Sequence, residues 1–252
     1  MVLKKTNKSN KKMSRASIAP DIFILPKTTK HKLPYFAICV VEMLSKHFPK
    51  TYVVGGAVRN LLLKQKVGDT DIATSAKPEQ VMNILKMNGI KVSGEHKKFG
   101  VILATSNAKQ TLEITTFRTD KYGKNRFPKV SFISSPAQDS RRRDFTVNAL
   151  YYSLAEGAVM DFNDGLEDIL NQNLAFIGNA KKRIQEDPLR IVRAYRLSLQ
   201  YNLSIDKKLE NILQSNLHLL KKVSAARIER EIKIVKSQKI KKQLQKVIHS
   251  NA

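Results

Sequence analysis

The chain has 252 residues and carries 46 lysines and arginines against 21 acidic residues, a formal net charge of +25. A hydrophobic content of 42% is enough for a buried core, which excludes a wholly disordered chain, and the length allows one large domain or two small ones. The longest apolar run, Tyr35 to Val41, is far shorter than the roughly 18 residues of a membrane span. No apolar segment of the kind found in secretory signals follows the lysine-rich N-terminus. One cysteine, Cys39, excludes an internal disulfide and a cysteine-based zinc site, so we expect a non-membrane protein of the reducing cytoplasm.

The charge balance predicts a polyanionic partner. A pI near 10.1 on a folded chain favours nucleic acid over anionic lipid, because no amphipathic membrane anchor is evident. A composition biased toward lysine is the alternative explanation. Charge alone indicates no reaction.

The first third of the chain begins with a basic stretch, residues 1–32, which we expect to be a disordered arm. Apolar periodicity and β-branched content then predict the following elements: a helix over 34–47, a strand over 51–54 that ends at Gly55-Gly56, a helix over 58–63, a strand over 69–73 and a helix over 78–87.

Two alternating, β-branched segments, 101–105 and 111–117, are the strongest strand signals, and a weaker one covers 130–133 beyond a polar loop over 119–129. Helices are predicted over 142–150 and 166–170, and from Pro188 the pattern is purely helical: to Leu199, then 207–213, then 224 to about 249. We therefore predict an α+β fold, with a head of mixed β-sheet flanked by helices at 33–180 and a helical segment at 181–252, the neck, whose basic residues would contact RNA phosphates.

The last predicted helix carries an apolar stripe. Its members are Ile228, Ile232, Val235, Ile240, Leu244, Val247 and Ile248. Such a stripe needs burial, either by the neck itself or by a second copy of the chain in a homo-oligomer.

Acids and glycines near the start of the predicted head suggest phosphate chemistry. Gly55 and Gly56 lack Cβ atoms, so the backbone can approach a phosphate closely. Asp69 and Asp71, two apart in a strand, would share one face. Two adjacent carboxylates are costly to ionise without a cation, and Mg²⁺ with nucleotide phosphates fits this need. The alternative is a Gly-Gly turn followed by two solvent-facing acids.

Five ordered segments resemble the motifs of the class II tRNA nucleotidyltransferases and bacterial poly(A) polymerases, a branch of the polymerase beta superfamily. They are TYVVGGAVRNLLLKQKVGDTDIAT (51–74), RRRDFTVNAL (141–150), DFNDGLEDI (161–169), EDPLRIVRAYRL (186–197) and SAARIEREIKIV (224–235), the last one degraded. Members of this family usually continue past the neck into helical body and tail domains, so the resemblance implies a chain truncated relative to the family.

The first motif implies metal binding by Asp69 and Asp71, and phosphate binding by Gly55, Gly56 and Arg59. The family has an acid where this chain has Asn60. Glu113, on the strand 111–117, is the expected third catalytic carboxylate, or else an ordinary strand acid.

In the second motif, Arg142 and Arg143 can bind a triphosphate bidentately, and Asp144 can accept a hydrogen bond from a ribose 2′-hydroxyl. Asn148, one turn further, would support the sugar or phosphate. The alternative is Asp144 as a helix cap beside a basic patch. In the third motif, Asp161, Gly165 and Asp168 imply a hinge between head and neck, or simply a turn with capping acids.

The fourth motif implies nucleotide selection, with Arg193 as a further nucleotide-binding residue. Asp187 and Arg190, placed three apart on one helix face, would accept from an exocyclic amine and donate to a ring nitrogen. Cytosine and adenine both offer that pattern, whereas uracil and guanine do not. A surface salt bridge is the alternative. The loop 120–128, with Asp120 and Arg126, resembles the flexible loop of A-adding members.

The prediction is a Mg²⁺-dependent, template-independent enzyme that adds CMP and AMP from CTP and ATP to the 3′ end of tRNA with release of pyrophosphate. A poly(A) polymerase or an A-adding enzyme with the same head is the nearest alternative. A catalytically silent RNA-binding protein is the alternative from another class.

Overall fold

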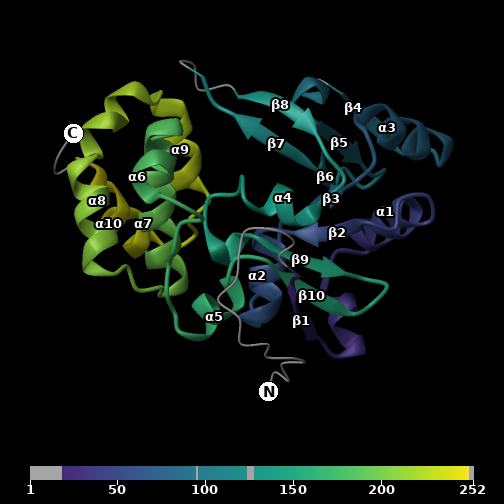
Figure 1. Cartoon of the computed structure of the whole chain (residues 1–252), viewed down its shortest axis with the longest axis horizontal. Helices are drawn as coiled ribbons and strands as arrows, with labels where there is room; N and C mark the ends of the chain where they lie inside the picture. The colour runs from purple at the N-terminus through teal and green to yellow at the C-terminus, as the bar shows by residue number, and fades with distance from the viewer. Residues whose placement is uncertain (1–18, 95, 124–127, 250–252) are drawn as a thin grey trace.

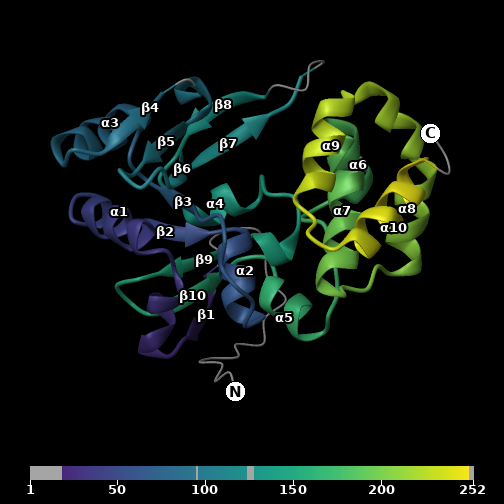
Figure 2. The same ribbon diagram turned by 180° about the vertical axis from the view of Figure 1, so that it is seen from behind.

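The computed structural model describes residues 19–94, 96–123 and 128–249 of the chain. A head built on an eight-stranded sheet is followed by a bundle of helices at one end of the molecule (Figure 1). The view from behind shows the same separation between head and bundle (Figure 2). The predicted α+β class, a mixed sheet with flanking helices followed by a helical neck, is confirmed.

The strands of the main sheet follow one another across it in the order β1 (Asp21–Ile24), β10 (Ala158–Asp161), β9 (Leu150–Ser153), β2 (Thr51–Val54), β3 (Asp71–Thr74), β6 (Thr111–Thr116), β5 (Val101–Thr105) and β4 (Lys91–Ser93). Neighbours are antiparallel, apart from the parallel pair of β3 and β6. A separate hairpin of β7 (Arg118–Lys121) and β8 (Lys129–Phe132) continues from β6.

The two faces of the sheet differ because strand side chains alternate in direction. One face packs against α1 (Tyr35–Ser45), α2 (Gly56–Leu62) and α3 (Pro78–Met87), where residues such as Val53 and Ile72 belong to the main core. The other face carries a small cluster that includes Tyr52, Val54, Phe117 and Tyr151. Short elements between strands are η1 (Lys27–Lys32), η2 (Lys97–Phe99), α4 (Pro136–Ser140) and η3 (Thr146–Asn148). The functional side chains described below lie on this second face.

The helices after the sheet are α5 (Gly165–Leu170), α6 (Ala180–Glu186), α7 (Leu189–Tyr201), α8 (Lys207–Ser215), η4 (Leu217–Lys222), α9 (Ala225–Lys233) and α10 (Gln238–His249). Helix α7 contacts α6, α9 and α10. The predicted apolar stripe is covered within the chain, since Val235, Leu244 and Ile248 are buried in the same core as α7. The neck itself covers these three residues, and the homo-oligomer stays a prediction.

The predicted disordered arm is wrong over residues 19–32, and residues 1–18 lie outside the described residues. Asp21–Ile24 forms the edge strand β1, which pairs with β10, and η1 follows it. The physical reason is that Phe23 and Leu25 bury their side chains in the head. The prediction of disorder rested on the many lysines of this segment and did not consider the burial of Phe23 and Leu25.

The predicted helix over 142–150 is also wrong. This segment forms a turn and the short helix η3 and then enters β9. Residues from Phe145 to Tyr152 are almost entirely buried, which is typical of a segment that leads into a central strand. The predicted loop over 119–129 begins instead as strand β7, and the long last helix is divided into α9 and α10 at Ser237, whose carbonyl accepts the first helical bond of the second helix.

None of the helices in the described part of the chain is both long and apolar enough to cross a bilayer.

Candidate active site

A cleft of about 440 Å³ opens where the second face of the sheet meets the helical bundle. Arginines outnumber carboxylates among its lining residues, which include Arg118, Arg142, Arg143, Arg190, Arg193 and Arg196 alongside Asp71, Glu113, Asp120, Asp144 and Asp187. A second cavity of about 680 Å³ shares Asp120, Tyr122 and Asp187 with it and extends over α6 toward Arg227. An excess of guanidinium groups suits a polyphosphate ligand.

Two of the three predicted carboxylates face each other across neighbouring strands. Asp71 is the first residue of β3 and stands in register with Glu113 on the parallel strand β6. The surrounding protein atoms, and then the like charge of Glu113, raise the pKa of Asp71 to about 6. A cation held between two such acids would favour their ionised forms.

The sequence predicted that Asp69 lies on the strand. In the structure it lies in the bend before β3, and it is exposed. Its charge still contributes to the raised pKa of Asp71. Among the described residues, no set of three acidic, histidine or cysteine side chains is arranged to hold a metal ion. The geometry therefore supports a two-carboxylate site at Asp71 and Glu113, with Asp69 nearby.

Gly55 ends β2 with φ of +72°, a conformation that L side chains rarely adopt. A Cβ atom here would lie 3.3 Å from Asp71 Oδ2 and 3.9 Å from Arg143 Nη1. At Gly56, a Cβ atom would lie 3.2 Å from Arg59 Nη2. The two glycines thus let the backbone pass close to these side chains, and the predicted approach to a phosphate stays a prediction.

Arg59, predicted to bind phosphate, lines the cleft but is only 5% exposed. Its guanidinium donates to the Asn148 side chain, to Asn60 Oδ1 at 3.1 Å and to the Tyr201 hydroxyl at 2.6 Å, and it stacks on the Tyr201 ring. Burial lowers the pKa of this arginine below its ordinary value. These contacts tie α2 to α7 through Arg59, and its role in phosphate binding stays a prediction.

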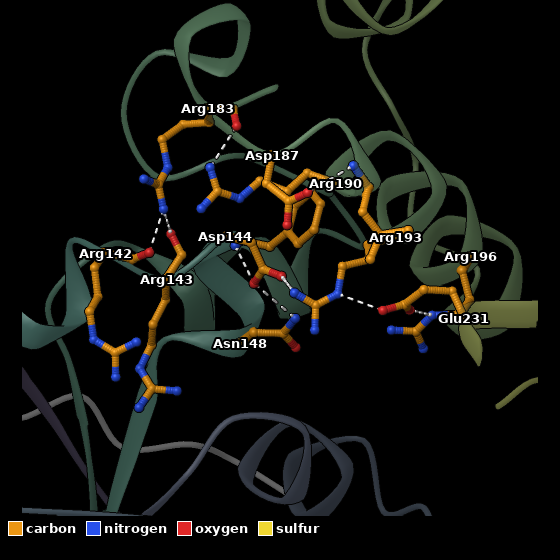
Figure 3. A network of polar contacts seen from close by, with 12 residues as sticks. Arg142, Arg143, Asp144, Asn148, Arg183, Asp187, Arg190, Arg193, Arg196 and Glu231 are labelled. Carbon is orange, nitrogen blue, oxygen red and sulfur yellow. Dashed lines mark hydrogen bonds and ion pairs between the residues drawn. The ribbon is translucent and has the colours of Figure 1, made fainter. Parts of the chain in front are cut away.

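Arg142 and Arg143 project side by side from the loop after α4 into the cleft (Figure 3). Both are held from behind by Asp139, with Arg142 Nε at 2.8 Å and Arg143 Nη2 at 3.3 Å from its carboxylate. Sequence reasoning identified the two arginines and missed Asp139, although its spacing of three and four residues from them is a usable signal.

Asp144 is fixed by three donors. Its Oδ1 accepts from the Phe145 amide at 2.8 Å and from Asn148 Nδ2 at 3.4 Å, and its Oδ2 accepts from Arg193 Nη1 at 2.8 Å. Burial alone would raise the pKa of Asp144, but the charge of Arg193 and these hydrogen bonds bring it below the ordinary value. Asp144 is therefore ionised and well oriented, and it does not cap a helix of the predicted kind.

Arg193 links this acid of the head to the neck. Its Nε lies 3.0 Å from Glu231 of α9, and the other oxygen of Glu231 accepts from Arg196 Nε at 2.9 Å (Figure 3). Glu231 lies in the fifth quoted segment, yet it was not among the predicted site residues. Arg193 lines the cleft, as predicted for a nucleotide-binding residue, and also acts as a bridge.

Asp187 and Arg190 both line the cleft but do not share a helix face, because Asp187 ends α6 with extended backbone angles. Asp187 Oδ2 accepts from Arg227 Nη2 of α9 at 2.9 Å. Arg190 Nη1 donates to Glu186 Oε2 at 3.0 Å and to the Arg183 carbonyl at 2.6 Å. The structure thus brings the two predicted base-reading groups to one wall, each held by its own partner.

Strand β7 of the β7–β8 hairpin and the residues directly after it line both cavities. Arg118 Nε donates to Asp120 Oδ1 at 3.0 Å, which fixes the base of this hairpin. Arg118 was not predicted, and Arg126 of the predicted flexible loop lies outside the described residues.

The third motif forms a packed turn. Asp161 accepts from the amides of Asn163 and Leu166, and Asp168 accepts from Thr146 Oγ1 at 2.5 Å. A Cβ atom on Gly165 would lie 2.2 Å from the Thr146 carbonyl oxygen, so this glycine allows α5 to pack on η3. These contacts agree with the turn and capping interpretation, and the hinge role stays a prediction.

Comparison with known proteins bears on this site. Residues 51–175 match the poly A polymerase head domain family. A CCA-adding enzyme of Lactococcus lactis subsp. cremoris (strain MG1363) is 41% identical over 191 residues, which is 75% of this chain and 47% of the relative. A CCA-adding enzyme of Lactobacillus helveticus (strain DPC 4571) is 36% identical over 221 residues, 87% of this chain and 51% of the relative.

Solved structures give the same picture. The CCA-adding enzyme of Bacillus stearothermophilus in complex with CTP superposes with a TM-score of 0.69 at 33% identity, over 83% of this chain and 48% of that one. A tRNA nucleotidyltransferase complexed with a primer tRNA and an incoming ATP analog gives 0.67 at 26% identity, over 84% and 60%. The chain spans about half the length of the curated relatives it matches.

Proposed function

Because residues 51–175 belong to the poly A polymerase head domain family, we propose that this chain is an RNA nucleotidyltransferase that adds CMP and AMP to the 3′ end of tRNA. The substrates are CTP, ATP and a tRNA whose terminal CCA is incomplete. No nucleic-acid template takes part, and pyrophosphate leaves at each step. The proposed substrate and the single cysteine fit a cytoplasmic setting.

The observation that carries the proposal is the arrangement of opposite charges around Gly55. Asp71 and Glu113 share a register position, and a Cβ atom on Gly55 would lie 3.3 Å from Asp71 Oδ2 and 3.9 Å from Arg143 Nη1. The arginine pair 142–143 lines the same cleft as the two acids. Nucleotidyl transfer needs this combination: carboxylates that hold a metal ion beside the attacking hydroxyl, and positively charged side chains around the triphosphate.

Asp71 and Glu113 are suited to a divalent cation, and we assign Mg²⁺ to them, with Asp69 as a third candidate ligand. Mg²⁺ commonly uses one or two carboxylates together with substrate phosphates and water, which matches a site of two acids. The raised pKa of Asp71 is consistent with this fit: burial is its largest cause, and the repulsion from Glu113, which comes second, is what a bound cation would relieve. When bound, the ion would promote ionisation of the RNA 3′-hydroxyl and neutralise charge on the triphosphate.

The chain's own residues orient the nucleotide. Arg142 and Arg143 would hold the triphosphate so that its α-phosphorus faces the RNA 3′-hydroxyl. Asp144, fixed by Arg193 and Asn148, is placed to accept a hydrogen bond from the ribose 2′-hydroxyl. This acceptor gives the site a means to prefer ribonucleotides.

Base selection would fall to Asp187 and Arg190. Asp187 accepts from the amino group of cytosine or adenine, and Arg190 donates to the adjacent ring nitrogen. Uracil and guanine present a carbonyl oxygen where Asp187 needs a donor, which leaves polar groups unpaired. The contacts of Arg227 with Asp187 and of Glu186 with Arg190 support this role, because each reader is restrained before a base arrives.

The test is a set of transfer reactions on three tRNAs that end before CCA, after C and after CC, with CTP and ATP given singly and together. Growth of the shortest substrate by three nucleotides, followed by arrest, supports the proposal. Extension only of the tRNA that ends in CC indicates an A-adding enzyme, and long adenosine tracts indicate a poly(A) polymerase. RNA binding without incorporation of either nucleotide indicates a silent RNA-binding protein.

A further inference from the structure

Asp139 is a carboxylate with no exposed surface, and the roles assigned above do not include it. It lies near the end of α4, behind the wall of the cleft. Its Oδ1 accepts from Arg142 Nε at 2.8 Å and from the Arg118 amide at 3.1 Å. Its Oδ2 accepts from the Tyr151 hydroxyl at 2.6 Å and from Arg143 Nη2 at 3.3 Å. Four donors thus converge on one buried acid.

These contacts restrain each guanidinium from the side away from the ligand. Arg142 is held through Nε, and Arg143 through Nη2 and through Nε, which donates to the Tyr151 hydroxyl at 3.0 Å. Arg143 Nη1 is directed toward Gly55, where it would lie 3.9 Å from a Cβ atom. Asp139 and Tyr151 therefore leave Arg143 Nη1 and both terminal nitrogens of Arg142 unengaged.

The cluster is stable as an ionised group. Burial alone would raise the pKa of Asp139, but the charges of Arg142 and Arg143 and the Tyr151 hydroxyl bring it below the ordinary value. Arg142 and Arg143 are largely buried and share the single carboxylate of Asp139, so this wall of the cleft keeps a net positive charge. An anion of high charge density is the ligand that such a wall attracts best.

We propose that Asp139, together with Tyr151, is a positioning residue that fixes Arg142 and Arg143 for the triphosphate and so gives the site its preference for nucleoside triphosphates over diphosphates and monophosphates. This inference rests on the proposed function, because it takes the ligand of the two arginines to be the phosphate chain of a nucleotide. Asp139 itself touches no substrate; it acts through the arginines.

The test is a binding series measured by calorimetry with the full chain and four ligands: cytidine, CMP, CDP and CTP. EDTA is present, so that protein groups rather than a metal ion bind the phosphates and no transfer occurs. In the unaltered protein, affinity should rise with each phosphate. In Asp139→Asn, which keeps the shape of the side chain and loses its charge, affinity for CTP should fall about tenfold or more, with cytidine changed less than about twofold.

Tyr151→Phe provides a milder variant that removes only the shared hydroxyl, and CTP affinity should fall about threefold. Tyr152→Phe is its matched control, since Tyr152 is the next residue of β9 and lies in the core on the opposite face of the sheet. This control should reproduce the unaltered series. Thermal unfolding of each variant shows whether the fold is retained.

The outcomes separate the roles. Loss of affinity that grows with phosphate number supports positioning, whereas an equal loss for all four ligands overturns it and shows a purely structural acid. If Asp139→Asn fails to fold, Tyr151→Phe decides, and a series identical to that of Tyr152→Phe overturns the proposal. An unaltered protein whose affinity does not rise with phosphates also overturns it. A protein that passes this binding test but transfers no nucleotide to tRNA contradicts the proposed function alone.

Discussion

Asp71 and Glu113 stand at the same register position of β3 and β6, the one parallel pair among the described neighbours of the main sheet. Parallel strands point their side chains to the same face at matched positions, so the two acids are held together by backbone geometry alone. Within the described residues, no lysine, arginine or histidine lies at ion-pair distance from either acid. The fold therefore concentrates negative charge where a cation is needed.

This concentration of charge should cost stability when no cation is bound. Because the folded-state pKa of Asp71 is raised to about 6 from 3.8, ionisation destabilises the fold as pH rises through this interval. Asp71→Asn removes the effect and should raise the free energy of unfolding at pH 7 by about 1 kcal/mol, after allowance for solvent screening. The measurement is urea unfolding in EDTA at pH 4 and pH 7. A stability gain as large at pH 4 as at pH 7 would contradict the electrostatic cause.

The ribose contact predicts a change in sugar preference. Asp144→Ala removes the acceptor for the 2′-hydroxyl. The preference for CTP over dCTP in kcat/KM should therefore fall about tenfold, which corresponds to the free energy of one hydrogen bond to a charged group. Glu229→Gln, on an exposed and solvated ion pair with Lys233, is the control and should leave this ratio unchanged. An Asp144 variant that slows CTP and dCTP equally would assign the acid to folding rather than to sugar recognition.

Base selection should relax when Asp187 loses its charge. An asparagine can present its amide nitrogen as a donor to uracil or guanine, so Asp187→Asn should raise incorporation of UTP relative to CTP by about tenfold. Competition between the two nucleotides on a tRNA that lacks CCA measures this ratio. If the variant loses CTP incorporation and the ratio of UTP to CTP stays fixed, Asp187 supports the site through Arg227 and does not read the base.

For Arg59 we expect a loss of stability with little change in nucleotide binding. Arg59→Lys loses the planar fork that joins Asn148, Asn60 and Tyr201, so the free energy of unfolding should fall by about 1–2 kcal/mol. The KM for CTP should change less than about twofold, because the guanidinium binds protein groups and not phosphate. Steady-state kinetics and urea unfolding of the same preparation give both numbers. A large rise in KM with full stability would support the phosphate-binding role instead.

Local sequence signals were enough for much of this architecture. The strand that ends in Gly55-Gly56, the helix of α3 and the β-branched strands β5 and β6 are correctly predicted because propensity and burial agree within each segment. The segment 142–150 was predicted wrongly because continuous burial, set by β10 and β2 on either side of β9, overrides its helix-like apolar spacing.

In the site, too, local sequence pattern identified some residues, while others depend on tertiary packing. Residues within the five quoted segments, such as Asp71 and Arg143, could be named from their local pattern. The partners that orient them come from distant parts of the chain: Tyr201 contacts Arg59 across 142 positions, and Arg227 contacts Asp187 across 40. Such contacts depend on how α7 and α9 pack against the head, which periodicity does not specify.

The role of the two acids in transfer is tested by nucleotide addition to a tRNA that lacks CCA, with CTP, ATP and Mg²⁺, by the unaltered chain and by Asp71→Asn and Glu113→Gln. Product length is read on a sequencing gel, and a cooperative thermal unfolding transition like that of the unaltered chain shows that each variant is folded. The account predicts growth by three nucleotides for the unaltered chain and a loss of about a thousandfold or more in rate for both variants. Three-nucleotide growth that persists at a similar rate in either folded variant would contradict it.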